Sequence, residues 1–195
     1  WKALSFLMRV LLVIPIAITP TVVGLVGRLL FNRDFGFINY LLSLVGVPPV
    51  SWLGEPLPAM VTIALVDIWQ WTPFVALAML AALESLPTEL YEAAVVDGAS
   101  AWSLVRYISL PLLQPYIVAI LLLRAIDAFK IFDTVFVLTG GGPGTATEVL
   151  NFYAYVAGFR PFNMGFTATV SWSIVVIMIV IFMLFLRAFE RLEEV

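Results

Sequence analysis

Cysteine and histidine are both missing from this 195-residue chain. Their absence excludes disulfides, thiolate nucleophiles, imidazole bases and metal sites built from His or Cys ligands. Charged residues are scarce as well, at 12% of the chain against about 25% in an ordinary soluble domain. The formal net charge is −3 and the ten basic residues are scattered, so no clustered cationic surface for nucleic acid is expected. We expect no catalytic residue and no bound metal.

Apolar residues, in contrast, make up 63% of the sequence, and the mean hydropathy is +1.07. These values are typical of a membrane protein. We predict an all-α, polytopic membrane helical bundle that forms a single transmembrane domain, with about four spans near residues 10–30, 59–82, 116–138 and 165–186. Pro15 and Pro20 should kink the first span, and a neighbouring helix or a wet cavity must then satisfy the freed carbonyl groups.

Ionisable and polar residues inside the second and third spans are the candidates for a solute pathway. Charged groups at membrane depth usually face a bundle interior or water. Those of the third span are spaced three residues apart, which makes neighbours of them on one helix face. Asp67 and Lys130 lie at equal predicted depth, so we expect an ion pair between them, although Asp127 and Asp133 compete for Lys130 within its own helix. The candidates are Asp67, Trp69, Gln70, Trp71, Arg124, Asp127, Lys130 and Asp133.

A polar segment, residues 84–115, separates the second span from the third. Pro87 and Thr88 should open a short helix that Asp97-Gly98 closes. Ser100 can cap a second helix near residues 101–108, and Pro111 should stop that helix by residue 110, because proline disfavours the α conformation in the residue before it. The expected product is a helix-turn-helix that faces water.

The spacing within this segment resembles the EAA loop of ABC-importer membrane subunits. Glu92-Ala93-Ala94 is followed by three residues, Gly98, nine residues, Ile108, one residue and Leu110-Pro111. Three further stretches resemble carbohydrate-uptake permeases of the maltose and glycerol-phosphate type: FNRDFGFINYLL with the later Trp52-Leu53, DIWQWTPF, and Phe132-Asp133 followed by TGGGP. The resemblance implies that the loop docks on an ATPase through Glu92, Ala93, Ala94, Asp97, Gly98, Ile108, Leu110 and Pro111.

The resemblance also implies the partners. They are a cytoplasmic ABC ATPase dimer that holds ATP and Mg, a second homologous permease subunit, and an extracytoplasmic solute-binding protein, all acting at a bacterial or archaeal cytoplasmic membrane. This chain itself should carry no cofactor. The family core has six spanning helices, so a chain with four is expected to lack the first two.

Basic residues indicate the orientation of the chain. With four spans, both termini lie on the side of the EAA loop, together with Lys2, Arg9, Arg106, Arg187 and Arg191. Arg28, Arg33 and Arg160 lie on the other side, so the first side is predicted to be cytoplasmic. The glycine-rich segment at residues 139–148 is then external, and it lacks the lysine that a nucleotide-binding loop needs.

Two other functions remain open at this point. A proton-coupled secondary transporter could use carboxylates at membrane depth as a relay, although it would leave the EAA spacing unexplained. An intramembrane aspartyl protease could use Asp67 and Asp127 as a dyad. Arg124 and Lys130 stand one turn from Asp127, however, which is typical of an ion pair rather than of a shared proton.

Overall fold

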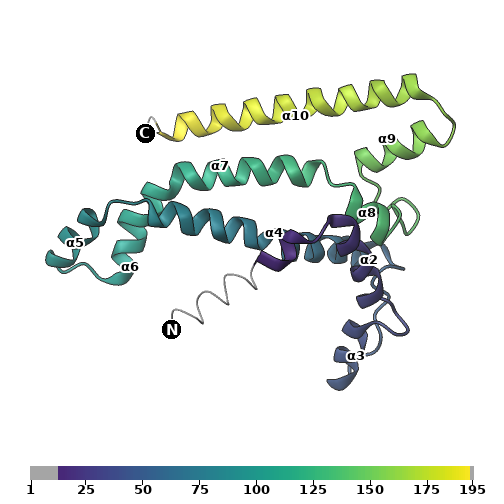
Figure 1. The fold of residues 1–195 in the computed structure, drawn as a ribbon, viewed down its shortest axis with the longest axis horizontal. Coiled ribbons are helices and arrows are strands. Elements are labelled where there is room, and N and C mark those ends of the chain that lie inside the picture. Colours follow the sequence, from purple (N-terminus) through teal and green to yellow (C-terminus); the bar gives the residue numbers. More distant parts are fainter. Residues whose placement is uncertain (1–12, 194–195) are drawn as a thin grey trace.

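The computed structural model describes the backbone of residues 13–193 and the side chains of residues 13–187. Every regular element in this part is helical, which confirms the predicted all-α class (Figure 1). Residues 13–17 form a helical stretch. The elements that follow are α2 (Pro20–Leu30), α3 (Phe37–Leu44), α4 (Pro56–Glu84), α5 (Thr88–Val96), α6 (Ala101–Leu104), the π-helical turn η1 (Val105–Ser109), α7 (Leu110–Phe129), α8 (Asp133–Leu138), α9 (Leu150–Phe159) and α10 (Met164–Glu193).

Three stretches of the described chain are long and apolar enough to cross a membrane. They are Pro56–Glu84, Ala101–Phe129 and Met164–Arg187. Figure 1 shows these helices running along the longest axis of the molecule, with α5 and α6 at one end and α2, α8 and α9 at the other. The predicted number of about four spans therefore becomes three in the part of the chain that the structure describes.

The predicted first span, residues 10–30, is interrupted. Thr19 is extended, with φ −64° and ψ 144°, and α2 begins only at Pro20. Proline disfavours the helical conformation in the residue before it, so the break falls where the chain reaches Pro20. At ~1.5 Å per residue the 11 residues of α2 reach ~17 Å, well short of a ~30 Å hydrocarbon core. Residues 10–12 of this predicted span lie outside the described residues.

The predicted third span, residues 116–138, also has different bounds. The long helix ends at Phe129, and a new helix, α8, begins at Asp133. Aromatic packing accounts for the change of direction, because Phe132 lies 5.5 Å from Phe136 and 5.5 Å from Tyr155 of α9, between ring centroids. Asp133 in the first turn of α8 also suits the positive end of that helix.

At its other end the same helix is longer than predicted. Pro111 was expected to end the second helix of the polar segment, yet α6, η1 and α7 form one continuous helix from Ala101 to Phe129. The π turn explains how Pro111 is accommodated. Leu110 N–H donates to the carbonyl of Val105, five residues back, and this wider turn gives room for a ring that would clash in a regular α-helix.

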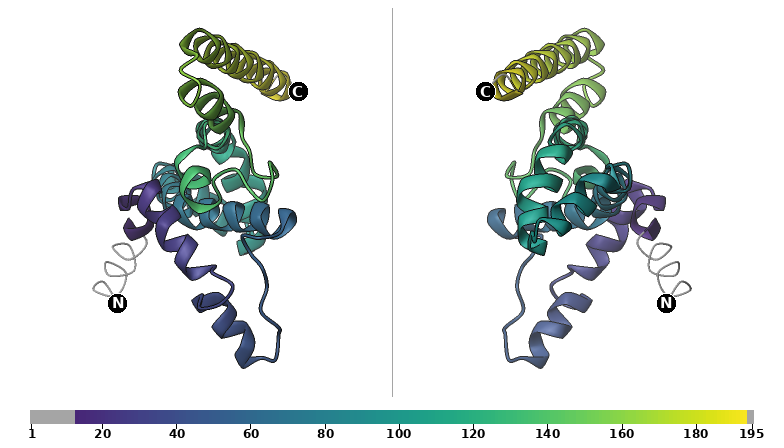
Figure 2. Two further views of the ribbon diagram at one scale, coloured as in Figure 1. Left: turned by 90° about the vertical axis from the view of Figure 1, so that its right-hand side faces the viewer. Right: turned by 90° about the vertical axis from the view of Figure 1, so that its left-hand side faces the viewer.

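The end of the molecule opposite α5 and α6 is held together by close packing of α2 against α8 (Figure 1). Gly24 and Gly27 face this contact, and an added Cβ would lie 3.1 Å from Val137 and 3.2 Å from Leu138, respectively. Small residues let two membrane helices approach closely, as they do here. Val66 of α4 joins Leu138 in the buried core beneath them. Figure 2 shows α2 and α3 extending away from this core as an arm.

Candidate functional site

The first candidate site is α5 together with the turn that ends it. Its bounds agree with the prediction from Pro87, Thr88 and Asp97-Gly98. Ala99 N–H donates to the carbonyl of Ala94 at 2.9 Å, and Gly98 N–H donates to that of Val95 at 3.0 Å. These two bonds define a Schellman motif, in which the residue after the C-cap adopts a left-handed conformation. Gly98 has φ +79°, which explains the glycine at this position.

The surface of this turn is open within the described chain. Glu92, Ala93, Asp97 and Gly98 are exposed, and no heavy atom lies within 4 Å of a Cβ added at Gly98. Ser100 caps α6 as predicted, since its hydroxyl oxygen accepts from Ser103 N–H at 3.2 Å. A small, exposed, rigidly terminated helix end of this kind is suited to insertion into a recess of another protein.

One contact anchors α5 to the long helix behind it. The hydroxyl groups of Tyr91 and Ser109 lie 2.9 Å apart, and Ser109 is buried in the π turn. The remaining predicted loop residues lie along the same stretch. Ile108 is half-buried, whereas Leu110 and Pro111 are exposed. The docking turn, meaning residues 92–99, is thus attached directly to the helix that reaches the other candidate site.

The second candidate site is a charged pair between α4 and α7. Arg124 donates from Nη2 to Asp67 Oδ2 at 2.6 Å, and the two side chains are 16% and 21% exposed. The predicted pair between Asp67 and Lys130 is therefore wrong. Because α7 ends at Phe129, Lys130 lies at the helix terminus and not eight residues inside it, and Arg124 is the residue beside Asp67.

Trp71 packs against this charged pair, and one nitrogen of Arg124 has no hydrogen-bond partner in the described structure. The guanidinium carbon of Arg124 lies 4.8 Å from the centroid of the Trp71 ring, a cation–π distance. Nη1 of Arg124 is buried and has no hydrogen-bond partner in the described structure. A hollow of about 330 Å³ adjoins the pair and is lined by Ile68, Trp71, Thr72, Val75, Ala76 and Arg124.

Gln70, unlike its neighbour Trp71, is buried against the segment before α2. Its side chain is 2% exposed, and Nε2 donates to the carbonyl of Ile18 at 3.0 Å. Ile18 stands at the break before Pro20, where the helix no longer supplies a donor. The expectation that a neighbouring helix satisfies a carbonyl freed at this kink is confirmed, and Gln70 is the residue that does so.

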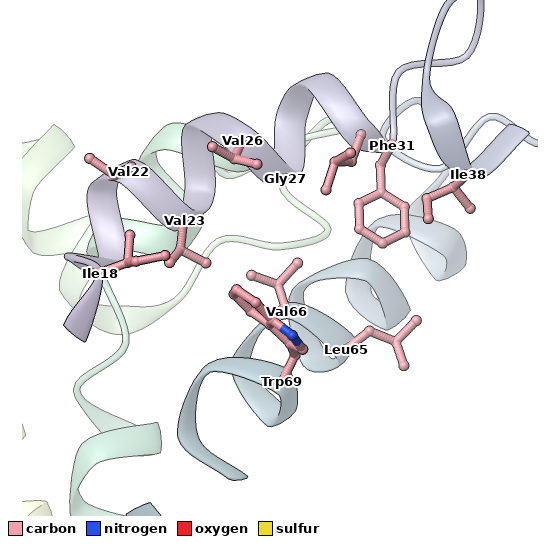
Figure 3. A pocket seen from close by; sticks show the side chains of 11 residues that line it. Ile18, Val22, Val23, Val26, Gly27, Phe31, Ile38, Leu65, Val66 and Trp69 are labelled. Carbon is pink, nitrogen blue, oxygen red and sulfur yellow. The ribbon is translucent and has the colours of Figure 1, made fainter. Parts of the chain in front are cut away.

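Trp69 points toward a third place, the groove between α2 and α4 (Figure 3). This hollow, also about 330 Å³, is lined by aliphatic side chains of α2 and α4 with Phe31 and Trp69. Its chemistry fits helix packing or a lipid chain better than a hydroxylated solute. The three consecutive candidates Trp69, Gln70 and Trp71 are therefore separated, since successive helix residues point about 100° apart.

The remaining candidates lie at the end of α7 and beyond it. Asp127 and Lys130 are paired at 3.4 Å within their own helix, and both are at least 39% exposed. Asp133 is exposed at the start of α8. The four charged residues that were predicted to share one face of the third span are therefore separated. Arg124 turns to α4, Asp127 and Lys130 pair locally, and Asp133 belongs to another helix.

Sequence reasoning missed Asn39, which organises the segment between α2 and α4. This amide is 6% exposed, and its Nδ2 donates to the carbonyls of Arg33 and Val50. Its Oδ1 accepts from Val50 N–H and from Trp52 Nε1. An asparagine within an apolar run was the available signal, because a buried amide needs four partners and so fixes the loop around it.

An all-helical domain with membrane-length helices, an exposed turn at one end and a charged pair between two of those helices is typical of a polytopic membrane protein. The family model of binding-protein-dependent transport system inner membrane components matches residues 2–194, and the chain belongs to that family. It is a multi-pass inner-membrane protein.

Individual relatives agree with this assignment. The chain is 45% identical over 175 residues to a probable ABC transporter permease, y4oQ, of Sinorhizobium fredii, covering 90% of this chain and 56% of that protein. It is 42% identical over 158 residues to the trehalose/maltose transport system permease MalF of Thermococcus litoralis, covering 81% and 52%. A crystal structure of a bacterial ABC transporter that imports the acidic polysaccharide alginate superposes with a TM-score of 0.88 at 24% identity, covering 97% and 67%. The chain spans just over half the length of these two permeases.

Proposed function

We propose that this chain is the core of a permease subunit in an ATP-driven, binding-protein-dependent importer of sugars. The observation that carries the proposal is the docking turn, residues 92–99. It is exposed, it ends in a glycine that needs its positive φ, and it leads through Ser100 into a membrane-length helix. Such a turn gives a separate ATPase a surface to bind and connects that surface to a helix that can move with it.

The partners follow from this arrangement. No Walker motif occurs in the sequence, so a cytoplasmic ABC ATPase dimer must supply ATP hydrolysis, with Glu92 and Gly98 at its contact. A second homologous permease subunit would complete the pathway, and a solute-binding protein would deliver the sugar from outside. The pathway residues that best fit this role are Trp71 and Arg124, which line one hollow, and Asp67, which pairs with Arg124.

The orientation of the chain belongs to the same proposal. Figure 1 places the end of α10 at the same end of the molecule as α5 and α6. Arg106 in η1 and Arg187 in α10 therefore accompany the docking turn, consistent with a cytoplasmic face rich in Arg and Lys. We place the C-terminal end of the chain in the cytoplasm. The N-terminal end, also expected there, lies outside the described residues.

The solute class rests on the similar proteins. The permease from Thermococcus litoralis serves trehalose and maltose, and the structural neighbour imports alginate. Both are carbohydrates, so we assign a carbohydrate to this chain. A proton relay is less well supported, because the Asp67 carboxylate is held by Arg124 at 2.6 Å. An aspartyl dyad is less well supported too, since Asp67 and Asp127 have different cationic partners.

The test is a Gly98→Leu importer, assembled with its ATPase and binding protein in liposomes. We expect it to lose stimulated ATP hydrolysis and uptake by about tenfold or more, because a branched side chain both strains a positive φ and fills the docking surface. Gly46→Leu is the matched control. Gly46 has φ +77° and equally open surroundings, but it lies in the external segment. Full coupling in the Gly98→Leu complex would refute the assignment.

A further inference from the structure

We propose that α3 lies in the bilayer surface at the end of the molecule opposite the docking turn, with one apolar face of the helix in contact with phospholipid. The occupant of that face is the lipid surface and not another protein chain. Three features of the arm formed by α2 and α3 support this placement. They are an exposed apolar face, the direction of the arm, and the level at which the arm lies beside α4.

One face of α3 is both apolar and exposed. Four side chains at the spacing i, i+3, i+4 and i+7 form a single stripe along the helix. They are between 44% and 65% exposed: Phe37, Tyr40, Leu41 and Leu44. The rings of Phe37 and Tyr40 stack with 6.3 Å between their centroids. Since α3 contains no charged residue, this stripe gains free energy by leaving water for an apolar surface.

The opposite side of α3 fixes the direction in which the stripe faces. Asn39 Nδ2 donates to the carbonyl of Val50, and Asn39 Oδ1 accepts from Val50 N–H and from Trp52 Nε1. At ~100° per residue, Asn39 lies about 160° around the helix axis from both Phe37 and Leu41. These hydrogen bonds therefore hold α3 against the segment that returns to α4 and turn the apolar stripe away from that segment.

The arm runs across the direction of the membrane-length helices. Those helices follow the longest axis of the molecule, and the arm leaves them sideways (Figure 1). Figure 2 looks along that axis, and the arm extends away from the core in both of its views. Spanning helices set the direction of the membrane normal, so an amphipathic helix that crosses this direction lies along the membrane surface.

The level of the arm beside α4 agrees with its direction. α4 has 29 residues, or ~44 Å at ~1.5 Å per residue, which exceeds the ~30 Å hydrocarbon core. Counted back from Glu84 at the polar end, ~30 Å corresponds to about 20 residues and reaches Ala64. The next residue, Leu65, lines the same groove as Ile38 of α3 (Figure 3). α3 is therefore level with the boundary of the hydrocarbon core, where interfacial helices lie.

The chemistry of this region favours lipid over a protein partner. Val22 and Val26 of α2, with Leu65 and Trp69 of α4, are each about half exposed and continue the apolar surface from the arm onto a membrane-length helix. Tyr40 adds an aromatic ring with a polar tip, which is typical of membrane interfaces. A protein interface normally has a polar rim, and α3 offers no charged residue for one.

The experiment measures the surroundings of α3 in the assembled importer, reconstituted in lipid bilayers. This chain contains no cysteine, so a nitroxide label can be placed at single positions once cysteines elsewhere in the importer are replaced. Electron paramagnetic resonance then compares the collision rate of the label with oxygen, which concentrates in lipid, and with a nickel chelate, which stays in water.

We expect the ratio of oxygen to nickel collisions at Leu41→Cys and Leu44→Cys to exceed that at Ser43→Cys by about threefold or more, because the apolar face of an interfacial helix is buried about 5–10 Å. Ser43 is the matched control. It is exposed on the same helix, but it lies about 160° around the axis from Leu41. Phe37→Cys, on the same stripe, repeats the measurement if a label at Leu41 or Leu44 prevents folding.

Two results would overturn the proposal. A ratio at the stripe equal to that at Ser43, with frequent nickel collisions at both, would show that the stripe faces water. Rare collisions of the stripe labels with both reagents would show that a protein chain covers it, either a second permease subunit or a solute-binding protein. Failure of the proposed function is distinguishable, because Gly98→Leu tests coupling, whereas these collision rates require neither ATP nor sugar.

Discussion

The hydrogen bond from Gln70 to the carbonyl of Ile18 should be a main support of the broken first helix. Replacing Gln70 by Leu keeps the side chain apolar and similar in size but leaves the carbonyl without a donor. The site is buried, because Gln70 is 2% exposed. An unsatisfied buried carbonyl costs about 1–3 kcal/mol, and hydrogen bonds between membrane helices measure about 0.6 to 1.7 kcal/mol. We therefore expect a loss of about 1–2 kcal/mol.

The assay is reversible unfolding of the full-length subunit in mixed micelles, followed by steric trapping or circular dichroism. Gln114→Leu on α7 is the matched control, since that glutamine is exposed and the same chemical change should cost less than about 0.5 kcal/mol. Pro20→Ala supplies a further test. If the helix then continues through residue 18, Val22 N–H can reach the Ile18 carbonyl, and Gln70→Leu should become nearly neutral in that background. Equal costs in both backgrounds would refute the reasoning.

Two other predictions concern the end of the molecule opposite α5 and α6. Gly140→Ala, with φ +63° and open space around it, should cost about 1–2 kcal/mol in the same unfolding assay from the backbone alone. Gly141→Ala should cost about 1–3 kcal/mol more than this control, because its φ is also positive, at +83°, and its Cβ would in addition lie 2.6 Å from Cε1 of Phe152. Equal costs for the two variants would contradict the predicted clash. Asn39→Leu should raise the amide exchange rate of Val50 by about tenfold or more, since the change removes the acceptor of that N–H and about 1–3 kcal/mol of local stability; unchanged exchange at Val50 would contradict the role of Asn39.

Local chemistry made the docking turn predictable. Proline at one end, Asp97-Gly98 at the other and Ser100 beyond them each act within a few residues, so the helix bounds follow from the sequence. The need for a donor near Pro20 was predictable for the same reason. The identity of that donor was not, because Gln70 lies 52 residues away and only packing brings it to Ile18.

The errors have a common cause in contacts between distant residues. The chain turns after α7 where Phe132 packs against Tyr155 of α9, a contact between residues 23 apart in the sequence that no local pattern predicts. The predicted third span was consequently nine residues too long at this end, because it ran to residue 138 whereas α7 ends at Phe129. The membrane depths of its charged residues, which were counted from residue 138, were therefore wrong. The pair of Asp67 with Arg124 was lost through that error. The π turn before Pro111 was missed for a different reason. Helix propensities indicate whether residues are helical, but they do not distinguish a hydrogen bond to the fifth residue back from the usual bond to the fourth.

The straight helix α7 links the polar end of the molecule to the charged pair between α4 and α7. Arg124 lies 14 residues beyond Leu110, where α7 begins, or ~21 Å along the axis at ~1.5 Å per residue. If α7 pivots at Leu110, a tilt of about 8° moves the guanidinium sideways by roughly 3 Å, the length of one hydrogen bond. A small rotation of α7 would then be enough to part Arg124 from Asp67. Opening and closing of the pathway would require no change of fold, only a change of angle.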